Sequence, residues 1–145
     1  FILMNLQNNK QSGFTIVELL IVVVVIGILA AITLVAFNGV QNRSKTTAGE
    51  ALAGQVAKKA EAYNAIDNVY PSAKADFAKK PESKLDNEES VVETDLNSGS
   101  ARGGKTVMYK PCTAGAGKSV TGAVISYWSY TDNAIKQNKI GVGCA

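Results

Sequence analysis

Residues 14–32 read FTIVELLIVVVVIGILAAI, an apolar run interrupted near its start by one carboxylate, Glu18. An apolar stretch of this length, read as a helix, is long enough to span a bilayer. An ionised side chain within it costs roughly 2.5–3.5 kcal/mol on insertion scales, so such a residue usually has a function and a partner. No Lys, Arg or His lies between Phe14 and Asn42. The nearest cationic partner is therefore the α-amino group of Phe14, provided that the chain is cut just before it.

The residues from Met4 to Gly13 favour such a cut. They are polar, include Lys10, and end in a small residue directly before the apolar run. A secretory signal peptide is instead cleaved after its apolar region. Cleavage after Gly13 would remove the polar part and leave the apolar helix on a mature chain that begins at Phe14. We therefore expect a cleaved leader at residues 1–13, with translation starting at Met4.

Residues 13–22, GFTIVELLIV, resemble the prepilin processing motif of type IV pilins and pseudopilins, and residues 26–32, IGILAAI, match as well. The resemblance covers about the first 30 residues of the mature chain. It implies that a prepilin peptidase cuts after Gly13 and N-methylates Phe14. It also implies that Glu18 pairs with the Phe14 amine of a neighbouring subunit during assembly. Many family members have a helix-breaking proline where this chain has Val35, so the family's kink is not carried over.

The resemblance further implies a structural subunit of a type IV pilus or related filament. Such a subunit is a single-pass membrane protein before assembly and then part of an extracellular homo-oligomeric filament. An inner-membrane assembly platform and a cytoplasmic assembly ATPase would build it. The alternatives are a pseudopilin of a type II secretion or DNA-uptake apparatus, and a monomeric membrane-anchored surface binding protein. Cell adhesion, twitching motility and DNA uptake stay open, as do DNA or a host surface as filament ligands.

Composition restricts the other function classes. The formal charge is +3, and the expected mature side chains carry +2, because residues 1–13 contain one Lys and no acid. That charge is too mild to indicate nucleic-acid binding. The chain has no His, which excludes His-based general base catalysis and most catalytic zinc sites. Residues 99–106, GSARGGKT, fit the phosphate-loop pattern, but the segment before them is polar and a predicted strand follows, where nucleotide binding needs a helix. We predict no enzyme activity, cofactor or metal site.

The two cysteines, Cys112 and Cys144, are predicted to form a disulfide. Lys10 before the span favours a cytoplasmic N-terminus, so the C-terminal domain lies outside, where disulfides persist. The part after Pro71 is small and would need such a staple, worth roughly 3–4 kcal/mol. The alternatives are two free thiols or half of a metal site, and the absence of His and of a CxxC pair disfavours the metal site.

The predicted fold is α+β and type IV pilin-like. A helix is predicted from about Thr15 to Val69. Its first half lies in the transmembrane and assembly segment, residues 14–40, and its second half belongs to a globular headgroup that begins at residue 41. The headgroup, 41–145, comprises an amphipathic helix at 41–70, a loop region at 71–105 and a C-terminal antiparallel sheet at 106–145. Tyr70-Pro71 is expected to stop the helix. Apolar residues recur at helical spacing on the face expected to meet the sheet: Ala48, Leu52, Val56, Tyr63, Ile66 and Val69.

Strands are predicted at Thr106–Lys110, Val120–Tyr130 and Lys136–Val142, with a short strand or turn at Val91-Val92. Four aromatic residues fall in these strands: Tyr109, Tyr127, Trp128 and Tyr130. One interpretation is a platform that stacks on DNA bases or binds a surface. The other, which we favour, is core and cross-strand packing.

Overall fold

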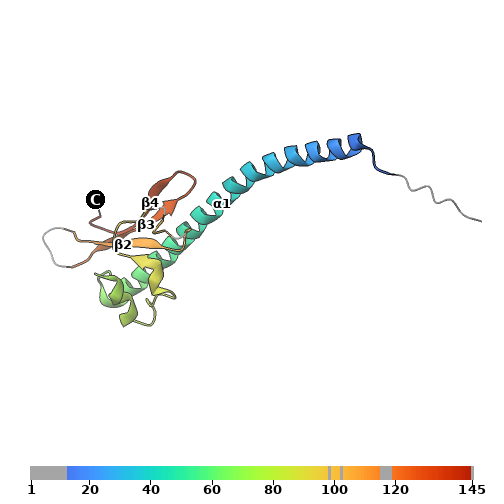
Figure 1. Cartoon of the computed structure of the whole chain (residues 1–145). Coiled ribbons are helices and arrows are strands. Elements are labelled where there is room, and N and C mark those ends of the chain that lie inside the picture. Colours follow the sequence, from blue (N-terminus) through green and yellow to red (C-terminus); the bar gives the residue numbers. More distant parts are fainter. Residues whose placement is uncertain (1–12, 98, 102, 115–118, 145) are drawn as a thin grey trace, which may run out of the picture. The chain divides into compact units, whose positions relative to one another are not determined.

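The computed structural model describes residues 13–97, 99–101, 103–114 and 119–144, without the side chain of Glu89. Most of the predicted leader, residues 1–12, lies outside this description. The chain divides into two units, Phe1–Phe37 and Asn38–Ala145. Helix α1 (Ile16–Asp67) begins in the first unit and ends in the second (Figure 1).

The first unit consists, in its described part, of the apolar portion of α1 and the three residues before it. Its large apolar side chains are all about half exposed or more, from 49% for Val25 to 85% for Ile16 within the helix. The segment is long and apolar enough to cross a membrane. Because an exposed apolar surface of this size is unstable in water, lipid or other protein chains have to cover it.

The second unit holds the rest of α1 and a four-stranded sheet in the order β1-β2-β3-β4 (Figure 1). The strands are β1 (Val91–Val92), β2 (Val107–Cys112), β3 (Gly122–Ser129) and β4 (Ala134–Gly141). Strands β2, β3 and β4 are antiparallel neighbours, as predicted, whereas β1 runs parallel to β2 and makes the sheet mixed. Two short 3-10 helices, η1 (Lys74–Lys79) and η2 (Glu88–Ser90), precede the sheet. A long helix followed by a small sheet confirms the α+β fold class.

Alanines form most of the α1 face that meets the sheet. Ala53, Ala57 and Ala60 are at most 5% exposed, and Val56 and Tyr63 are also buried. These positions recur at helical spacing, so they form one stripe along the helix. The opposing sheet residues in the core are Val107, Tyr109, Ala123 and Ile125.

The predicted contact face was therefore partly wrong. Val56 and Tyr63 are buried as expected, but Ala48 and Ile66 are exposed and Leu52 is only partly buried. Small side chains let the helix backbone approach a sheet closely, so the alanine stripe is the better fit to the sheet. Leu52 and Ile66 consequently lie to one side of the face of α1 that contacts the sheet.

The end of α1 also differs by two residues from the prediction. Asn68 adopts a left-handed conformation with φ of 59°, which ends the helix at Asp67 rather than at Val69. Asparagine is one of the few residues that reach this conformation cheaply. The Tyr70-Pro71 stop that we expected from the sequence therefore comes after the helix has already ended.

A buried carboxylate, Asp76, organises the segment that follows. It accepts hydrogen bonds from the backbone N–H of Ser72 at 2.8 Å, the Ser72 hydroxyl at 2.6 Å and the backbone N–H of Ala73 at 3.1 Å. Lys79 Nζ lies 2.6 Å from its other oxygen. The hydrogen bond from Lys79 and those from Ser72 and Ala73 lower the pKa of Asp76 well below its ordinary value.

Gly104, in the loop before β2, lies directly against α1. Its φ is +87°, and a Cβ at this position would collide with the backbone carbonyl of Lys45. Gly103 also has a positive φ, but a Cβ there would meet only the Lys45 side chain, at 3.9 Å. The Gly103 N–H donates to the Tyr130 hydroxyl at 2.8 Å, and the Tyr130 N–H donates to Thr46 Oγ1 at 2.9 Å. One turn of α1 therefore holds both this loop and the turn between β3 and β4.

Strand β2 continues through Pro111 to Cys112, although the sequence predicted that proline would end it after Lys110. Proline cannot donate a backbone hydrogen bond, so it is tolerated where a strand has no neighbour on one side. Strand β1 pairs only with Val107 and Met108, and Pro111 therefore has β3 alone as a neighbour, opposite Ala123.

Candidate processing and assembly site

One of the functional residues predicted at the N-terminus, Glu18, takes part in a helical cap with Thr15. Thr15 precedes the first helical residue, and its hydroxyl oxygen accepts a hydrogen bond from the backbone N–H of Glu18 at 3.2 Å. Glu18 Oε2 in turn accepts from the Thr15 backbone N–H at 2.9 Å and from the Thr15 hydroxyl at 2.7 Å. This reciprocal arrangement is a capping box, which satisfies donors that a helix N-terminus otherwise leaves unpaired.

Sequence reasoning treated Glu18 as a carboxylate without a side-chain partner and missed this cap. The available signal was the spacing Thr-x-x-Glu directly before an apolar run, which is itself a sign of a capping box. The finding changes the energetic argument, because Thr15 already offsets part of the cost of placing Glu18 in an apolar segment. Glu18 Oε1 accepts none of the hydrogen bonds found within the described residues, so one oxygen remains for a further donor.

The predicted cleavage point lies just outside the helix. Gly13 and Phe14 precede the first helical turn, and both are exposed, Phe14 to 86%. A Cβ at Gly13 would meet nothing within 4 Å. The bond between Gly13 and Phe14 is therefore accessible and free of helical hydrogen bonding, as a peptidase substrate needs to be. Its cleavage, and the methylation of Phe14, remain predictions.

Behind the cap, the helix provides no second charge near Glu18. The next ionisable side chain along α1 is Arg43, and every residue from Leu19 to Asn42 is uncharged. A helix N-terminus favours a carboxylate by about 0.3–1 kcal/mol, which is less than the insertion cost. The arrangement is suited to receive a cation from outside the helix, and the Phe14 amine of a processed neighbour would be such a cation.

The predicted disulfide is present. Cys112 and Cys144 are bonded, with their Cα atoms 5.2 Å apart. The bond attaches the segment after β4 to the end of β2, two strands away in the sheet. The disulfide lies in the second unit and Glu18 in the first, so the bond is not part of the Glu18 cap.

The four aromatic residues do not form one platform. Tyr109 is buried, its hydroxyl donates to the Pro71 carbonyl at 2.9 Å, and burial raises its pKa. Tyr127 packs toward the core, whereas its neighbour Trp128 points to the other face of the sheet, as alternation along a strand requires. Tyr130 lies beside Lys45, with the ammonium 5.5 Å from the ring centroid. These contacts agree with the packing interpretation.

The segment that fits the phosphate-loop pattern, residues 99–106, also has a structural role in its described part. Its described residues lead directly into strand β2, so no helix N-terminus follows it. Gly103 and Gly104 serve the close approach to α1 described above.

Comparison with known proteins points to the same end of the chain. A family model described as the prokaryotic N-terminal methylation motif matches residues 8–34, which include Gly13, Phe14 and Glu18. The chain therefore carries this motif.

Individual relatives are similar to part of the chain. The type IV major alpha-pilin of Moraxella bovis is 51% identical over 51 residues, which are 34% of this chain and 32% of that protein. A fimbrial protein of Dichelobacter nodosus is 51% identical over 47 residues, 32% of this chain and 29% of that protein. The type II secretion system core protein G of Pseudomonas aeruginosa is 33% identical over 67 residues, 46% of this chain and 47% of that protein.

The similarity is thus to type IV pilins, to fimbrial proteins and to a type II secretion system core protein. The chain spans about a third of the length of the curated pilins it matches and about half of the secretion protein. No solved structure matches the chain significantly.

Proposed function

We propose that this chain is the precursor of a structural subunit of a type IV pilus or a related extracellular filament, and that it is not an enzyme. The observation that carries the proposal is the junction at Gly13–Phe14. An exposed, non-helical peptide bond is followed by a capped carboxylate and then by an uncharged helix whose large side chains have no cover within the described chain. The methylation motif at residues 8–34 and the similarity to pilins support the same function.

The proposed sequence of events follows from this junction. A prepilin peptidase removes residues 1–13 and N-methylates Phe14, and the subunit waits as a single-pass membrane protein. The apolar helices of several copies then leave the lipid together and bundle. The Phe14 amine of one subunit neutralises Glu18 of its neighbour, which fixes the axial register because the surrounding surface is apolar. An inner-membrane platform and a cytoplasmic assembly ATPase drive the process.

A pseudopilin is the second candidate. The similarity to the secretion core protein covers 67 residues at 33% identity, a longer stretch than the 51 residues shared with the Moraxella pilin at 51% identity. A pseudopilin of a secretion or DNA-uptake apparatus would use the same helix and the same Glu18. The remaining alternative, a monomeric membrane-anchored binding protein, would leave the apolar helix in lipid permanently.

Processing is tested on the native N-terminal peptide by mass spectrometry. We expect the mature chain to begin at N-methylated Phe14. Gly13→Trp should trap the precursor in the membrane, whereas Gly13→Ala, which keeps a small residue, should still be cut. Since a side chain at Gly13 meets open space, a block can be assigned to the peptidase rather than to misfolding. A mature chain that retains Lys10 would contradict the proposal.

Polymerisation is tested by electron microscopy of the sheared surface fraction. A pilus subunit gives long filaments on the cell surface that contain this chain. A monomeric binding protein would instead stay in the membrane fraction and give no filament.

A further inference from the structure

A pocket of about 380 Å³ lies on the face of the sheet that is turned away from α1. Tyr109 and Ile125 belong to the core that the sheet forms with α1. Side chains alternate between the two faces along a strand. Their neighbours Lys110, Val124 and Ser126, which line the pocket, therefore point to the opposite face.

Ser126 is the unusual residue of this pocket. It is fully buried, with 0% exposure, and its hydroxyl has no hydrogen-bond partner among the described residues. Trp128, two residues further along β3 and so on the same face, has a buried Nε1 that also has no partner among them. Buried polar groups are nearly always hydrogen-bonded. This face of the sheet therefore has hydrogen-bonding capacity that the described chain does not use.

The residues that cover Ser126 can move aside. The strand register places Met108 on one side of Ser126 and Gln137 on the other. Both side chains line the pocket, and both are long and flexible, whereas serine is the short residue of the row. A shift of either side chain uncovers the Ser126 hydroxyl for a group that occupies the pocket.

Two lysines make the same region attractive to an anion. Lys110 and Lys139 pair with Val124 from its two neighbouring strands, so all three side chains are on one face. The backbones of these outer two strands are roughly 9–10 Å apart, which lets both exposed ammonium groups reach one group above Val124. Strands β2, β3 and β4 contain no Asp or Glu. Within the described part of the chain, neither lysine forms an ion pair.

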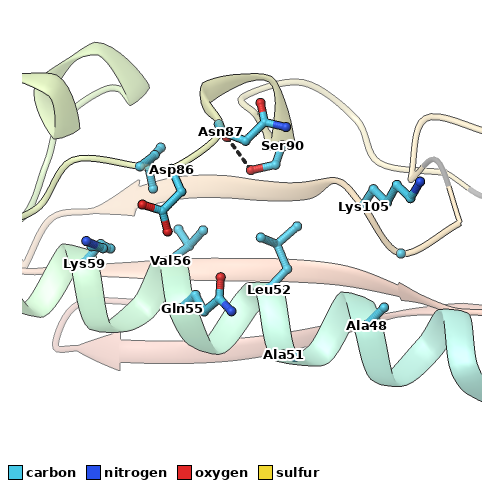
Figure 2. Close-up of a pocket in the computed structure, with 12 residues that line it drawn as sticks. Ala48, Ala51, Leu52, Gln55, Val56, Lys59, Asp86, Asn87, Ser90 and Lys105 are labelled. Carbon is cyan, nitrogen blue, oxygen red and sulfur yellow. Dashed lines mark hydrogen bonds between the residues drawn. The ribbon is translucent and has the colours of Figure 1, made fainter.

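The groove between α1, the segment at Leu85 and the loop at Gly104 differs in both respects (Figure 2). An acidic residue, Asp86, lies among its lysines. Its buried serine, Ser90, already donates to the Asn87 carbonyl at 2.6 Å (Figure 2). The Ser90 hydroxyl of the groove therefore needs no ligand, in contrast to Ser126 in the pocket.

We propose that the pocket on the outer face of the sheet binds a small organic anion. Its carboxylate or phosphate lies above Val124, between Lys110 and Lys139, and a second oxygen of the same molecule bonds to the Ser126 hydroxyl. Because Val124 and Ser126 are two residues apart on one strand, the two groups of the ligand are separated by roughly 6–7 Å. The site lies wholly in the second unit and adds ligand binding to the proposed structural role.

The test is an NMR titration of the full chain in maltoside micelles. The two probes are 5-hydroxypentanoate and 4-hydroxybutyl phosphate, in which a hydroxyl and an acidic group are about this far apart. Pentanoate lacks the hydroxyl, and 1-pentanol lacks the charge. We expect both probes to give saturable shifts of the amides of Val124, Ser126 and Gln137, and 1-pentanol to give none. The probe that binds more tightly identifies the acidic group.

Three variants separate the contributions. Lys110→Gln should weaken both probes about five- to tenfold. Lys58→Gln makes the same charge change on an exposed α1 position outside the pocket and should leave binding unchanged. Ser126→Ala should lower the affinity for 5-hydroxypentanoate to that for pentanoate. It should not lower the melting temperature, because the hydroxyl that it removes has no partner.

Several results would overturn the proposal. These are the absence of saturable shifts with both probes, equal binding of 1-pentanol, and equal losses from Lys110→Gln and Lys58→Gln. A lower melting temperature of Ser126→Ala would also overturn it, since the hydroxyl would then be bonded within the chain. None of these measurements requires filaments, so failure of the site is distinguishable from failure of the proposed filament function.

Discussion

The two roles available to Glu18, helix capping and charge pairing between subunits, can be separated by two substitutions. Glu18→Gln keeps a side-chain oxygen that can accept from the Thr15 N–H, so the capping box survives while the charge is lost. Thr15→Ala removes the hydroxyl that bonds the Glu18 N–H and Oε2, while the carboxylate remains. Glu18→Gln thus removes the charge and keeps the cap, whereas Thr15→Ala removes two of the three hydrogen bonds of the cap and keeps the charge.

The expected magnitudes differ enough to be measured. Loss of an N-cap costs about 0.5–2 kcal/mol, roughly a 2- to 30-fold change in an equilibrium constant. This is an upper limit for assembly, because the cap is lost from both the membrane subunit and the filament subunit. Removing one partner of a buried ion pair costs about 3–5 kcal/mol, roughly 100- to 4,000-fold. Glu18→Gln also makes the membrane state cheaper by up to the insertion cost of a charge, which shifts the balance further away from the filament.

The assay is the yield of sheared filaments divided by total membrane pilin for each variant. We expect Thr15→Ala to assemble at a moderately reduced level and Glu18→Gln to assemble poorly or not at all. Both should be cut after Gly13 at normal rates, which mass spectrometry of the N-terminal peptide checks. If Thr15→Ala is as damaging as Glu18→Gln, the carboxylate acts through the cap. If Glu18→Gln assembles normally, apolar packing alone sets the register and the charge-pair argument is refuted.

Three further predictions concern the second unit and are read by thermal or denaturant unfolding. Gly104→Ala should destabilise the second unit by more than the roughly 1–2 kcal/mol that a non-glycine residue in the left-handed conformation costs, because the added Cβ collides with the Lys45 carbonyl of α1. Gly103→Ala should show only that conformational cost, and equal losses from the two variants would contradict the close packing. Asp76→Asn should cost about 1.5–3 kcal/mol at neutral pH. Because folding lowers the pKa of Asp76, its stabilisation is full above the ordinary value near 4 and fades as the pH falls below it, so the wild-type advantage should vanish in acid. Replacing Cys112 and Cys144 by Ser should cost about 2–4 kcal/mol, and an unchanged melting temperature would show that the bond is dispensable.

The parts of this fold that sequence predicted are those that local pattern determines. The apolar run after Phe14, the amphipathic continuation and the three long strands each have a periodicity that one segment displays by itself. The cysteine pair was predictable because composition and topology left few alternatives. The helix end at Asn68 was missed because a single residue in a left-handed conformation outweighed the later Tyr70-Pro71 signal.

The remaining features depend on contacts between distant segments. The buried stripe of alanines on α1 is selected by how closely the sheet approaches, and hydrophobicity alone favours Leu52 and Ile66 instead. Pro111 is tolerated within β2 only because β1 is two residues long. The groove forms where the segments at Leu85 and Gly104 reach α1 from more than 25 positions away, which periodicity within any one segment cannot indicate.

Leaving the large apolar residues of α1 partly outside the core has a consequence for assembly. A helix that buried Leu52 and Ile66 under its own sheet would satisfy itself and offer little to a neighbour. Here alanines meet the sheet, while Leu52 is only partly buried and Ala48 and Ala51 are exposed. Leu52 and Ile66, which the sequence placed in the core, therefore keep apolar surface that is open to a neighbouring chain. We expect Glu18 to provide the specificity of register that an apolar contact lacks, because a charge pair in a dry environment is satisfied at one offset only.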